Sequence, residues 1–252
     1  MRWTDRNVRR ALGLPGPETE AIYSGISTDT RQLQQGSLFV ALKGDNFDAH
    51  DFLAQAAAAG ATGAVVRANT PDLAGLRLYR VADTLTALGE LAHARRKALT
   101  GPVIAITGTN GKTSTKEMLA AALRTRYRTH ATRINLNNLV GVPLTILEAP
   151  DDCEALVLEA GANQPGEMKR HREVIAPSLA VITNAGAGHL EGFGSSEQVL
   201  QELRLSRAPK ERDLLWKACG NHAGIMPSRG SSSCGGSAKS FVWRYCVSLS
   251  HD

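Results

Sequence analysis

The sequence lacks the features that would send a chain into or across a membrane. Its 252 residues contain no run of eighteen apolar residues, and the first residues do not form the apolar stretch of a signal peptide. We therefore expect no membrane insertion and a cytoplasmic location. Cysteine is also scarce: Cys153 stands alone in the body of the chain, and the other three cysteines have no metal-like spacing, which argues against zinc and a disulfide framework.

The body of the chain also lacks a basic surface suited to nucleic acid. The formal net charge is +5, but 8 basic and only 4 acidic residues follow Gln198, so the positive excess lies mostly in the C-terminal stretch. No stripe of lysine and arginine interleaved with aromatics runs through the body, and aromatics make up only 5% of all residues. We therefore expect no nucleic-acid partner.

The most informative stretch is an apolar run, a glycine turn and a helical segment in succession. Residues 103–107 have the length and composition of a strand. Residues 114–123 have the pattern of a helix, with Met118, Ala121 and Ala122 on one face. Strand, glycine turn and helix together are the context of a phosphate loop.

In such a loop the backbone N–H groups and the helix N-terminus attract an anion, Lys112 reaches the terminal phosphates, and the Thr113 hydroxyl can hold Mg²⁺. Only the second half of the usual eight-residue pattern is present, because Ile106 stands where its first glycine would fall. The alternative is a glycine turn before an ordinary helix with an exposed lysine. The predicted phosphate-binding residues are Thr107, Gly108, Thr109, Asn110, Gly111, Lys112 and Thr113.

The strand, loop and helix rhythm repeats after this loop. It predicts a parallel, doubly wound sheet with its ligand site at the carboxyl ends of the strands. Strands at 155–158 and 179–182 lead into Glu159 and into a loop that carries His189. A carboxylate beside Lys112 and a metal would stay ionised, so Glu159 is a candidate Mg²⁺ ligand. The alternatives are a solvated loop glutamate and a hydrogen-bonded loop histidine.

The N-terminal third predicts a small α/β domain. Strands are expected at 37–42, 63–66 and 76–81, with helices at 51–59 and 83–99. The polar cluster 27–31 has the composition of a turn with local side-chain caps. The chain thus divides into an N-terminal domain, a linker helix, a partial phosphate-loop (P-loop) domain and a C-terminal stretch with no core-forming pattern, which we expect to be disordered. Their predicted ranges are 1–82, 83–102, 103–198 and 199–252.

Four ordered motifs together resemble the Mur ligase family of peptidoglycan synthesis. The motifs are Thr107-Gly-Thr-Asn-Gly-Lys-Thr113, Asn135-Leu-Asn-Asn-Leu-Val-Gly-Val-Pro-Leu-Thr145, Glu159-Ala-Gly-Ala-Asn-Gln-Pro-Gly-Glu167 and Thr183-Asn-Ala-Gly-Ala-Gly-His-Leu-Glu-Gly-Phe-Gly194. The resemblance spans roughly residues 20–197. The third motif is most similar to the member that adds a dipeptide rather than a single amino acid.

The resemblance implies an ATP-dependent amide ligation that uses Mg²⁺. The carboxylate of a UDP-N-acetylmuramoyl tripeptide attacks the γ-phosphate of ATP, and the amine of D-Ala-D-Ala then displaces phosphate from the acyl phosphate. It assigns catalytic roles to Lys112, Glu159 and His189, with Thr113 and Glu159 on one Mg²⁺ and His189 on a second. Three asparagines would line the nucleotide region: Asn138, Asn163 and Asn184.

The same resemblance makes the N-terminal domain a uridine-nucleotide domain in a monomeric enzyme. Its implied substrate-binding residues are Ser27, Thr28, Asp29, Arg31, Lys43, Gly44 and His50. Taken without the resemblance, His50 is more typical of a helix-entry residue than of a ligand.

After Glu197 the sequence departs from the family pattern. The family continues with a helix that bears a carbamylated lysine, and Leu203 stands near that position here. We hypothesise a shifted reading frame near residue 199, which resequencing of the coding DNA would test. An inactive chain that binds ATP or UDP-sugar without turnover is the alternative. A small phosphate-loop kinase or ATPase is disfavoured by Glu159, where an aspartate would be expected, and by the unexplained asparagine segment.

Overall fold

The computed structural model describes residues 2–133, 135–184 and 214–216. The N-terminal third holds a parallel sheet with the order β3-β4-β5-β6 and a separate antiparallel pair, β1-β2. The strands are β1 Trp3–Thr4, β2 Ile22–Tyr23, β3 Ile26–Ser27, β4 Ser37–Val40, β5 Ala61–Arg67 and β6 Arg77–Val81. The three strands expected here are confirmed as β4, β5 and β6, whereas β1, β2 and β3 are too short to show a pattern.

Short helices connect these strands. They are α1 Asp5–Leu12, the 3-10 turns η1 Thr30–Gln32 and η2 Ala49–Phe52, and α2 Leu53–Ala58. The single helix expected at 51–59 is therefore a 3-10 turn followed by a short α-helix. The Asp48 side chain caps this turn by accepting a hydrogen bond from the His50 N–H, which explains why the turn starts earlier than alanine content alone predicts.

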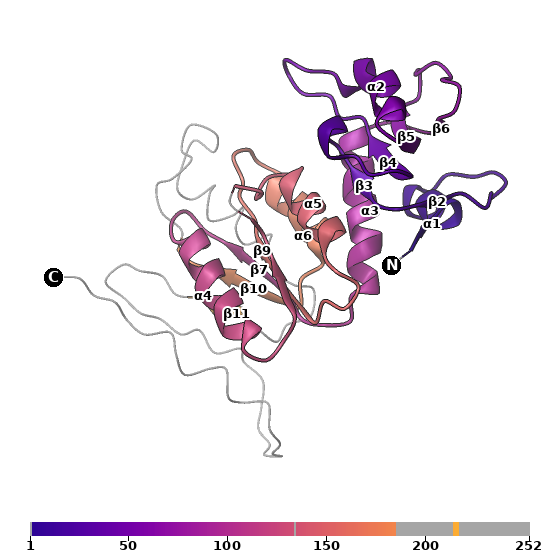
Figure 1. Cartoon of the computed structure of the whole chain (residues 1–252). Helices are drawn as coiled ribbons and strands as arrows, with labels where there is room; N and C mark the ends of the chain where they lie inside the picture. The colour runs from indigo at the N-terminus through magenta and orange to yellow at the C-terminus, as the bar shows by residue number, and fades with distance from the viewer. Residues whose placement is uncertain (1, 134, 185–213, 217–252) are drawn as a thin grey trace.

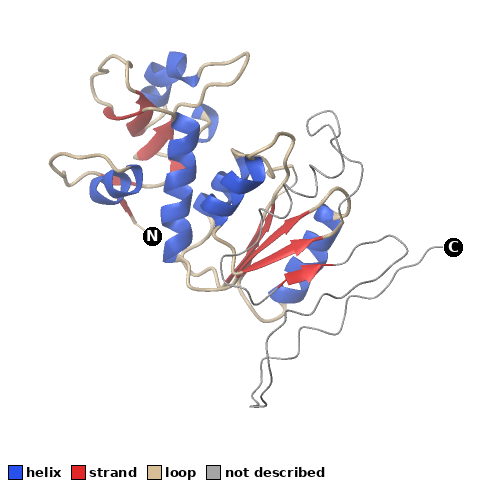
Figure 2. Ribbon diagram, turned by 180° about the vertical axis from the view of Figure 1, so that it is seen from behind, coloured by secondary structure: helices blue, strands red, loops and turns tan. Residues whose placement is uncertain are grey.

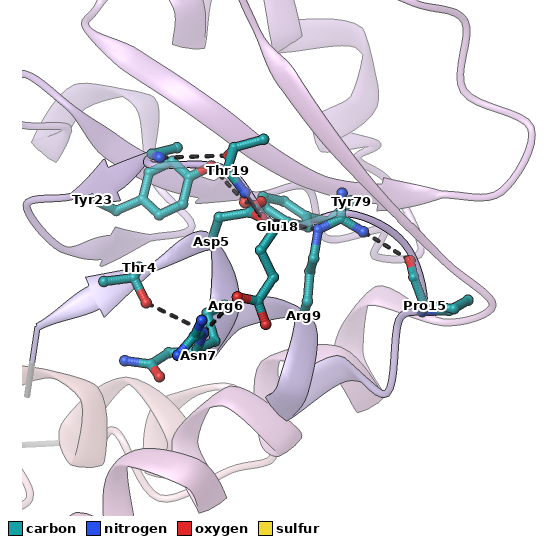
Figure 3. Close-up of polar contacts among 11 residues, drawn as sticks. Thr4, Asp5, Arg6, Asn7, Arg9, Pro15, Glu18, Thr19, Tyr23 and Tyr79 are labelled. Atoms are coloured by element: carbon teal, nitrogen blue, oxygen red, sulfur yellow. Dashed lines mark hydrogen bonds and ion pairs between the residues drawn. The ribbon is translucent and has the colours of Figure 1, made fainter.

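A buried polar group, here called the Asp5 cluster, joins α1 to the N-terminal sheet (Figure 3). Asp5 is 0% exposed and accepts hydrogen bonds from Tyr79 Oη at 2.6 Å, the Thr19 N–H at 2.9 Å and Arg9 Nε at 3.1 Å. Tyr23 Oη lies 2.7 Å from Tyr79 Oη. The cluster therefore ties α1 and the loop that follows it to β2 and β6.

The helix α3, Thr84–Ala98, begins after its cap Asp83, as the sequence predicts. Leu88 and Leu91 pack into the core of the N-terminal sheet, while Ala92 packs into the core of the second sheet. Figure 1 shows α3 as the long helix beside the N-terminal elements, with α5 and α6 next to it on the way to the second sheet. One helix thus contributes to two cores.

The second sheet is parallel with the order β11-β10-β7-β9-β8. Its strands are β7 Val103–Thr107, β8 Thr129–Ala131, β9 Ala155–Glu159, β10 Leu179–Ile182 and β11 Leu214–Trp216. Its helices are α4 Lys112–Arg124, α5 Gly141–Glu148 and α6 Glu167–Ile175. The α/β class with a doubly wound parallel sheet is confirmed. The strand β11 lies in the stretch expected to be disordered; the rest of that stretch, residues 199–213 and 217–252, is outside the described part of the chain.

Alternate side chains of β7 face opposite layers of helices. Val103 and Ala105 pack with α5 and α6, while Ile104 and Ile106 pack with α4. Figure 2 shows the sheet between these two layers. The helix after β7 therefore covers one face and the helix after the neighbouring β9 covers the other. Such a reversal opens a crevice at the carboxyl ends of the two strands, which is where doubly wound proteins bind ligands.

The helix α4 presents a different face to the core from the one its apolar residues suggest. Met118, Ala121 and Ala122 do share a face, but that face is exposed, and Met118 is 65% exposed. The buried side chains are Lys116 and Ala120. Within the described ranges, no helix combines the length and apolar character that a membrane crossing requires.

Candidate functional site

The loop after β7 turns through two glycines with positive φ, Gly108 at 134° and Gly111 at 78°. Gly111 is the residue before α4, and no side chain caps the first N–H groups of that helix. The N-terminus of a helix carries a partial positive charge and unpaired donors. This loop therefore has the geometry of an anion site, as the sequence predicts.

The end of β10 closes against the loop. A Cβ atom on Gly108 would lie 2.2 Å from Thr183 Oγ1, so only glycine fits there. Thr183 Oγ1 donates a hydrogen bond to the Asn110 carbonyl at 2.6 Å, and the Asn110 N–H donates to Asn184 Oδ1 at 2.9 Å. Asn184, predicted to line the nucleotide region, thus supports the loop backbone.

Lys112 folds back onto its own loop. Its Nζ donates to the carbonyls of Gly108 at 2.8 Å and Thr109 at 3.1 Å. Burial lowers the pKa of Lys112, and the charge of Glu159 acts in the opposite direction. Lys112 follows β7 and Glu159 ends the neighbouring strand β9, so both residues lie at the same edge of the sheet.

Glu159 is the last residue of β9 and is only 5% exposed. Its Oε1 accepts a hydrogen bond from Asn137 Nδ2 at 2.9 Å, and its N–H donates to Thr132 Oγ1 at 2.9 Å. The Asn137 carbonyl also accepts from the Gly161 N–H at 2.8 Å. Asn137 lies in the asparagine motif, but nothing in the sequence alone distinguishes it from its neighbours. The carboxylate is therefore held in place rather than solvated.

The other two predicted asparagines lie at the starts of helices. Asn138 Oδ1 accepts hydrogen bonds from the Val140 and Gly141 N–H groups at the start of α5. The Asn163 N–H donates to Glu167 Oε2 at the start of α6. His189 lies outside the described residues.

The donors at this crevice suit Mg²⁺. The ion prefers oxygen ligands and usually takes one or two carboxylates together with substrate phosphates and waters. Thr113 offers a hydroxyl in the first turn of α4, and Glu159 offers a carboxylate held by Asn137. No group of three His, Cys, Asp or Glu side chains with metal-site geometry occurs among the described residues. A site completed by phosphate oxygens fits this donor set better than a closed protein cage.

The predicted substrate residues of the N-terminal domain fall in two neighbouring turns. In the first, Ser27 Oγ accepts from the Asp29 N–H, Thr28 lies between them, and Arg31 forms an ion pair with Asp29 at 2.7 Å. Hydrogen bonds from the Arg31 side chain and N–H lower the pKa of Asp29 to about 2. The Arg31 side chain is 83% exposed, so it is accessible to a ligand.

The second turn contains Lys43 and Gly44, whose N–H donates to the Phe47 carbonyl, and it ends at His50. His50 Nε2 accepts from the Arg67 N–H at 3.0 Å, so Nδ1 carries the proton and donates to Asp48 at 2.6 Å. His50 and Arg67 line a cavity of about 660 Å³ with residues 68–73. Both ring nitrogens of His50 thus have hydrogen-bond partners in the fold.

Two family descriptions match the chain. "Mur ligase middle domain" matches residues 106–206, and "Mur ligase family, catalytic domain" matches residues 22–96. The chain belongs to the Mur ligase family. The resemblance stated from the four motifs is therefore confirmed. The glycine loop at 107–113 and Glu159 both lie within the matched middle domain.

The chain is similar to curated members of the family with one name, UDP-N-acetylmuramoyl-tripeptide--D-alanyl-D-alanine ligase. It is 41% identical to that of Bacillus subtilis over 82% of this chain and 46% of the relative. It is 47% identical to that of Escherichia coli over 68% of this chain and 37% of the relative. The chain thus spans less than half the length of either relative.

Solved structures agree with these relatives. MurF from Acinetobacter baumannii matches with a TM-score of 0.74 and 38% identity, over 82% of this chain and 46% of that chain. MurF ligase from Thermotoga maritima, solved in complex with ADP, matches with a TM-score of 0.67 and 32% identity, over 72% and 42%. The arrangement of both sheets is therefore that of known Mur ligases.

Proposed function

We propose that this Mur ligase takes part in joining D-Ala-D-Ala to a UDP-N-acetylmuramoyl tripeptide, with ATP and Mg²⁺, as a cytoplasmic monomer. The observation that carries the proposal is that Lys112 follows the glycine loop after β7 and Glu159 ends the neighbouring strand β9, so both lie at the carboxyl edge of the sheet. The names of the relatives supply the substrates. The ADP complex of the T. maritima MurF supports the nucleotide.

The proposed reaction has two displacements. A carboxylate oxygen of the tripeptide bonds to the γ-phosphorus as the bond to ADP breaks, which leaves an acyl phosphate and ADP. The amine of D-Ala-D-Ala then bonds to the acyl carbon as phosphate leaves, and the amine loses a proton to solvent or phosphate. The first step brings two anions together, so its barrier falls when positive charge is fixed beside the phosphates.

Lys112 and the loop provide that charge. The Nζ atom exchanges its two loop carbonyls, Gly108 O and Thr109 O, for phosphate oxygens, and the first N–H groups of α4 bind the anion. Thr113 and Glu159 would hold Mg²⁺, and His189 would help to hold a second ion. When bound, the metal neutralises phosphate charge and orients the γ-phosphate. Asn137 keeps the Glu159 carboxylate aimed at the crevice.

The N-terminal domain binds the uridine nucleotide in this proposal. Arg31 and Lys43 lie on two turns at the same sheet and supply positive charge for a diphosphate, while the cavity beside His50 is large enough for part of a nucleotide. The helix α3 connects this domain to the phosphate-loop domain, so the sugar-linked tripeptide can extend toward the crevice.

A second candidate is nucleotide binding without turnover. It is favoured by one fact: the chain covers only 46% of the B. subtilis relative and 37% of the E. coli relative. Residues that the relatives use in catalysis can lie in the part that this chain does not match.

One experiment separates the two candidates. The chain is mixed with ATP, Mg²⁺, UDP-N-acetylmuramoyl tripeptide and D-Ala-D-Ala, and phosphate release and product mass are followed together. The ligase proposal expects an amide product that disappears in Lys112→Ala and persists in Lys97→Ala, an exposed lysine on α3. If the chain binds ATP but forms no amide product, the second candidate is favoured. If the chain neither forms product nor binds ATP, the proposed nucleotide site is overturned.

A further inference from the structure

Lys116 is buried without a place in the proposed reaction. It lies one turn after Lys112 on α4 and is only 1% exposed, which makes it one of the largest fully buried side chains in the described part of the chain. Lysine is almost never fully buried unless it is paired, because an ammonium loses strong hydration. A methionine or leucine would fill the same space without that cost, so the ammonium needs an explanation.

The ammonium has two partners. Nζ donates to the Thr132 carbonyl at 2.8 Å and lies 2.7 Å from Glu117 Oε1. The Glu117 side chain is 56% exposed, so this ion pair is partly screened by water. The buried contact of Lys116 is therefore the one with Thr132, the residue that follows β8.

Thr132 passes this contact on to Glu159. Thr132 is 2% exposed, its N–H donates to the Val157 carbonyl at 3.0 Å, and its Oγ1 accepts from the Glu159 N–H at 2.9 Å. The side chain of Glu159 is then held by Asn137. A series of hydrogen bonds thus runs from α4 through Thr132 to the main-chain N–H of Glu159, whose carboxylate lies at the end of β9.

The helix that carries Lys116, α4, also begins with Lys112, the lysine of the glycine loop. Lys112 and Lys116 are four residues apart, so they lie on the same side of the helix. One contacts the loop and the other contacts the support of Glu159. The spacing between loop and carboxylate is therefore set through a single rigid helix.

We propose that Lys116 is a positioning residue that fixes Glu159 relative to the phosphate loop through Thr132. This inference rests on the proposed nucleotide site. It assigns to Lys116 control over the affinity for nucleotide with Mg²⁺, because the groups behind a metal ligand orient it and their loss typically weakens metal binding about 10–100-fold.

The alternative is that Lys116 only satisfies a buried carbonyl. The two roles differ in what they predict for Glu159: a positioning role requires its amide and its carboxylate to respond when the ammonium is removed, whereas a purely structural role affects only the stability of the fold.

The test uses Lys116→Met, which keeps the length of the side chain, and Thr132→Val, which removes the hydroxyl that accepts from Glu159. Thr132→Ser keeps a hydroxyl at this position and is the control for Thr132→Val. Lys97→Met, at an exposed lysine, is the control for Lys116→Met. Amide hydrogen exchange at Glu159 is measured without ligand. ADP affinity is then measured with and without Mg²⁺ in the full chain.

We expect hydrogen exchange at the Glu159 amide to become about tenfold faster or more in both Lys116→Met and Thr132→Val. The first substitution removes the charged hydrogen bond that holds Thr132, and the second removes the acceptor of the Glu159 N–H. The affinity for ADP with Mg²⁺ should fall about 10–100-fold in these two variants, while their affinity for ADP without Mg²⁺ stays near that of wild type. The control Lys97→Met should bind ADP as wild type does under both conditions. Thr132→Ser should retain most of the amide protection and Mg²⁺-dependent ADP affinity that Thr132→Val loses.

Unchanged protection of the Glu159 amide in Lys116→Met would overturn the inference, as would an equal loss of ADP affinity with and without Mg²⁺. Absence of ADP binding by the wild-type chain would instead refute the proposed nucleotide site. The exchange measurement needs no ligand, so it still decides whether Lys116 positions Glu159.

Discussion

The two sheets of this protein each carry a charged cluster, and the clusters are built in opposite ways. In the Asp5 cluster the carboxylate is closed off by Tyr79, Arg9 and the Thr19 N–H (Figure 3). In the crevice of the second sheet, Lys112 rests on carbonyls of its own loop, and α4 starts without a side-chain cap. Charges closed on one another contribute to stability, whereas charges resting on replaceable partners are available for a ligand.

The largest effect expected from this contrast is on stability at Asp5. Asp5→Ala leaves Arg9 and Tyr79 without their buried acceptor, and breaking a buried ionic network costs about 3–5 kcal/mol of unfolding free energy. Urea unfolding measures the change. ADP affinity of the folded fraction should stay unchanged, and a cost below about 1 kcal/mol would show that the cluster does not hold the N-terminal region together.

Lys112→Met should do the reverse. Loss of a charged hydrogen bond to phosphate is worth about 1.5–3 kcal/mol, so ADP affinity should fall about 10–100-fold. The urea midpoint should stay near that of wild type, because the two hydrogen bonds of Lys112 Nζ go to carbonyls of its own loop. Isothermal titration with ADP and Mg²⁺ measures the affinity, and Lys97→Met serves as control. Equal affinity in both variants would remove Lys112 from the site.

The Asp5 cluster should also make stability depend on pH. Burial alone would raise the pKa of Asp5, but hydrogen bonds from Tyr79, Thr19 and Arg9 outweigh it and lower the pKa. A carboxyl with a lowered folded pKa stabilises the fold above its unfolded pKa, about 3.9, and loses that contribution as pH falls through the folded value. Urea midpoints between pH 7 and pH 2.5 should therefore drop more steeply at the acid end in wild type than in Asp5→Asn.

The same cluster predicts a loss at high pH. Burial, with hydrogen bonds to Asp5 and Tyr23, raises the pKa of Tyr79 far above the ordinary value for tyrosine. A raised folded pKa means that the stabilisation is complete below the unfolded pKa, about 10, and declines as pH rises above it. Tyr79→Phe should flatten this alkaline decline, and an unchanged decline would place its cause elsewhere.

The smallest effect separates two arginines of α1. Arg9 is 20% exposed and pairs with buried Asp5, whereas Arg6 is 72% exposed and pairs with Glu18 at the surface. Arg9→Ala should cost about 1.5–3 kcal/mol of unfolding free energy, and Arg6→Ala about 0–1 kcal/mol. Thermal unfolding of both variants in low and high salt checks the difference, and equal costs would contradict the role of burial.

Local signals in the sequence predicted the strand, glycine turn and helix around Lys112, because the strand is a continuous apolar run and the glycines that follow permit the turn. They also located α3 through its cap Asp83. The asparagine motif was recognised, but neighbouring amides look alike in sequence. Only the fold shows that Asn137 reaches Glu159 while Asn138 caps α5.

Contacts between distant residues could not be predicted in this way. Asp5 and Tyr79 are 74 residues apart, and neither stands in a pattern that links them. The burial of Lys116 could not be predicted for another reason: lysine is almost never fully buried unless it is paired, so the sequence alone assigns it to solvent. The fold buries Lys116 instead, because Thr132 offers it a carbonyl acceptor.

The contact between Asn110 and Asn184 has a consequence during synthesis on the ribosome. These residues are 74 positions apart, and chains grow at about 5–20 residues per second, so the phosphate loop emerges roughly 4–15 seconds before the strand end that braces it. During that interval Thr183 and Asn184 are not there to hold the loop. We expect a nascent chain stalled before Thr183 to leave the loop open to a protease, and one released after Asn184 to protect it.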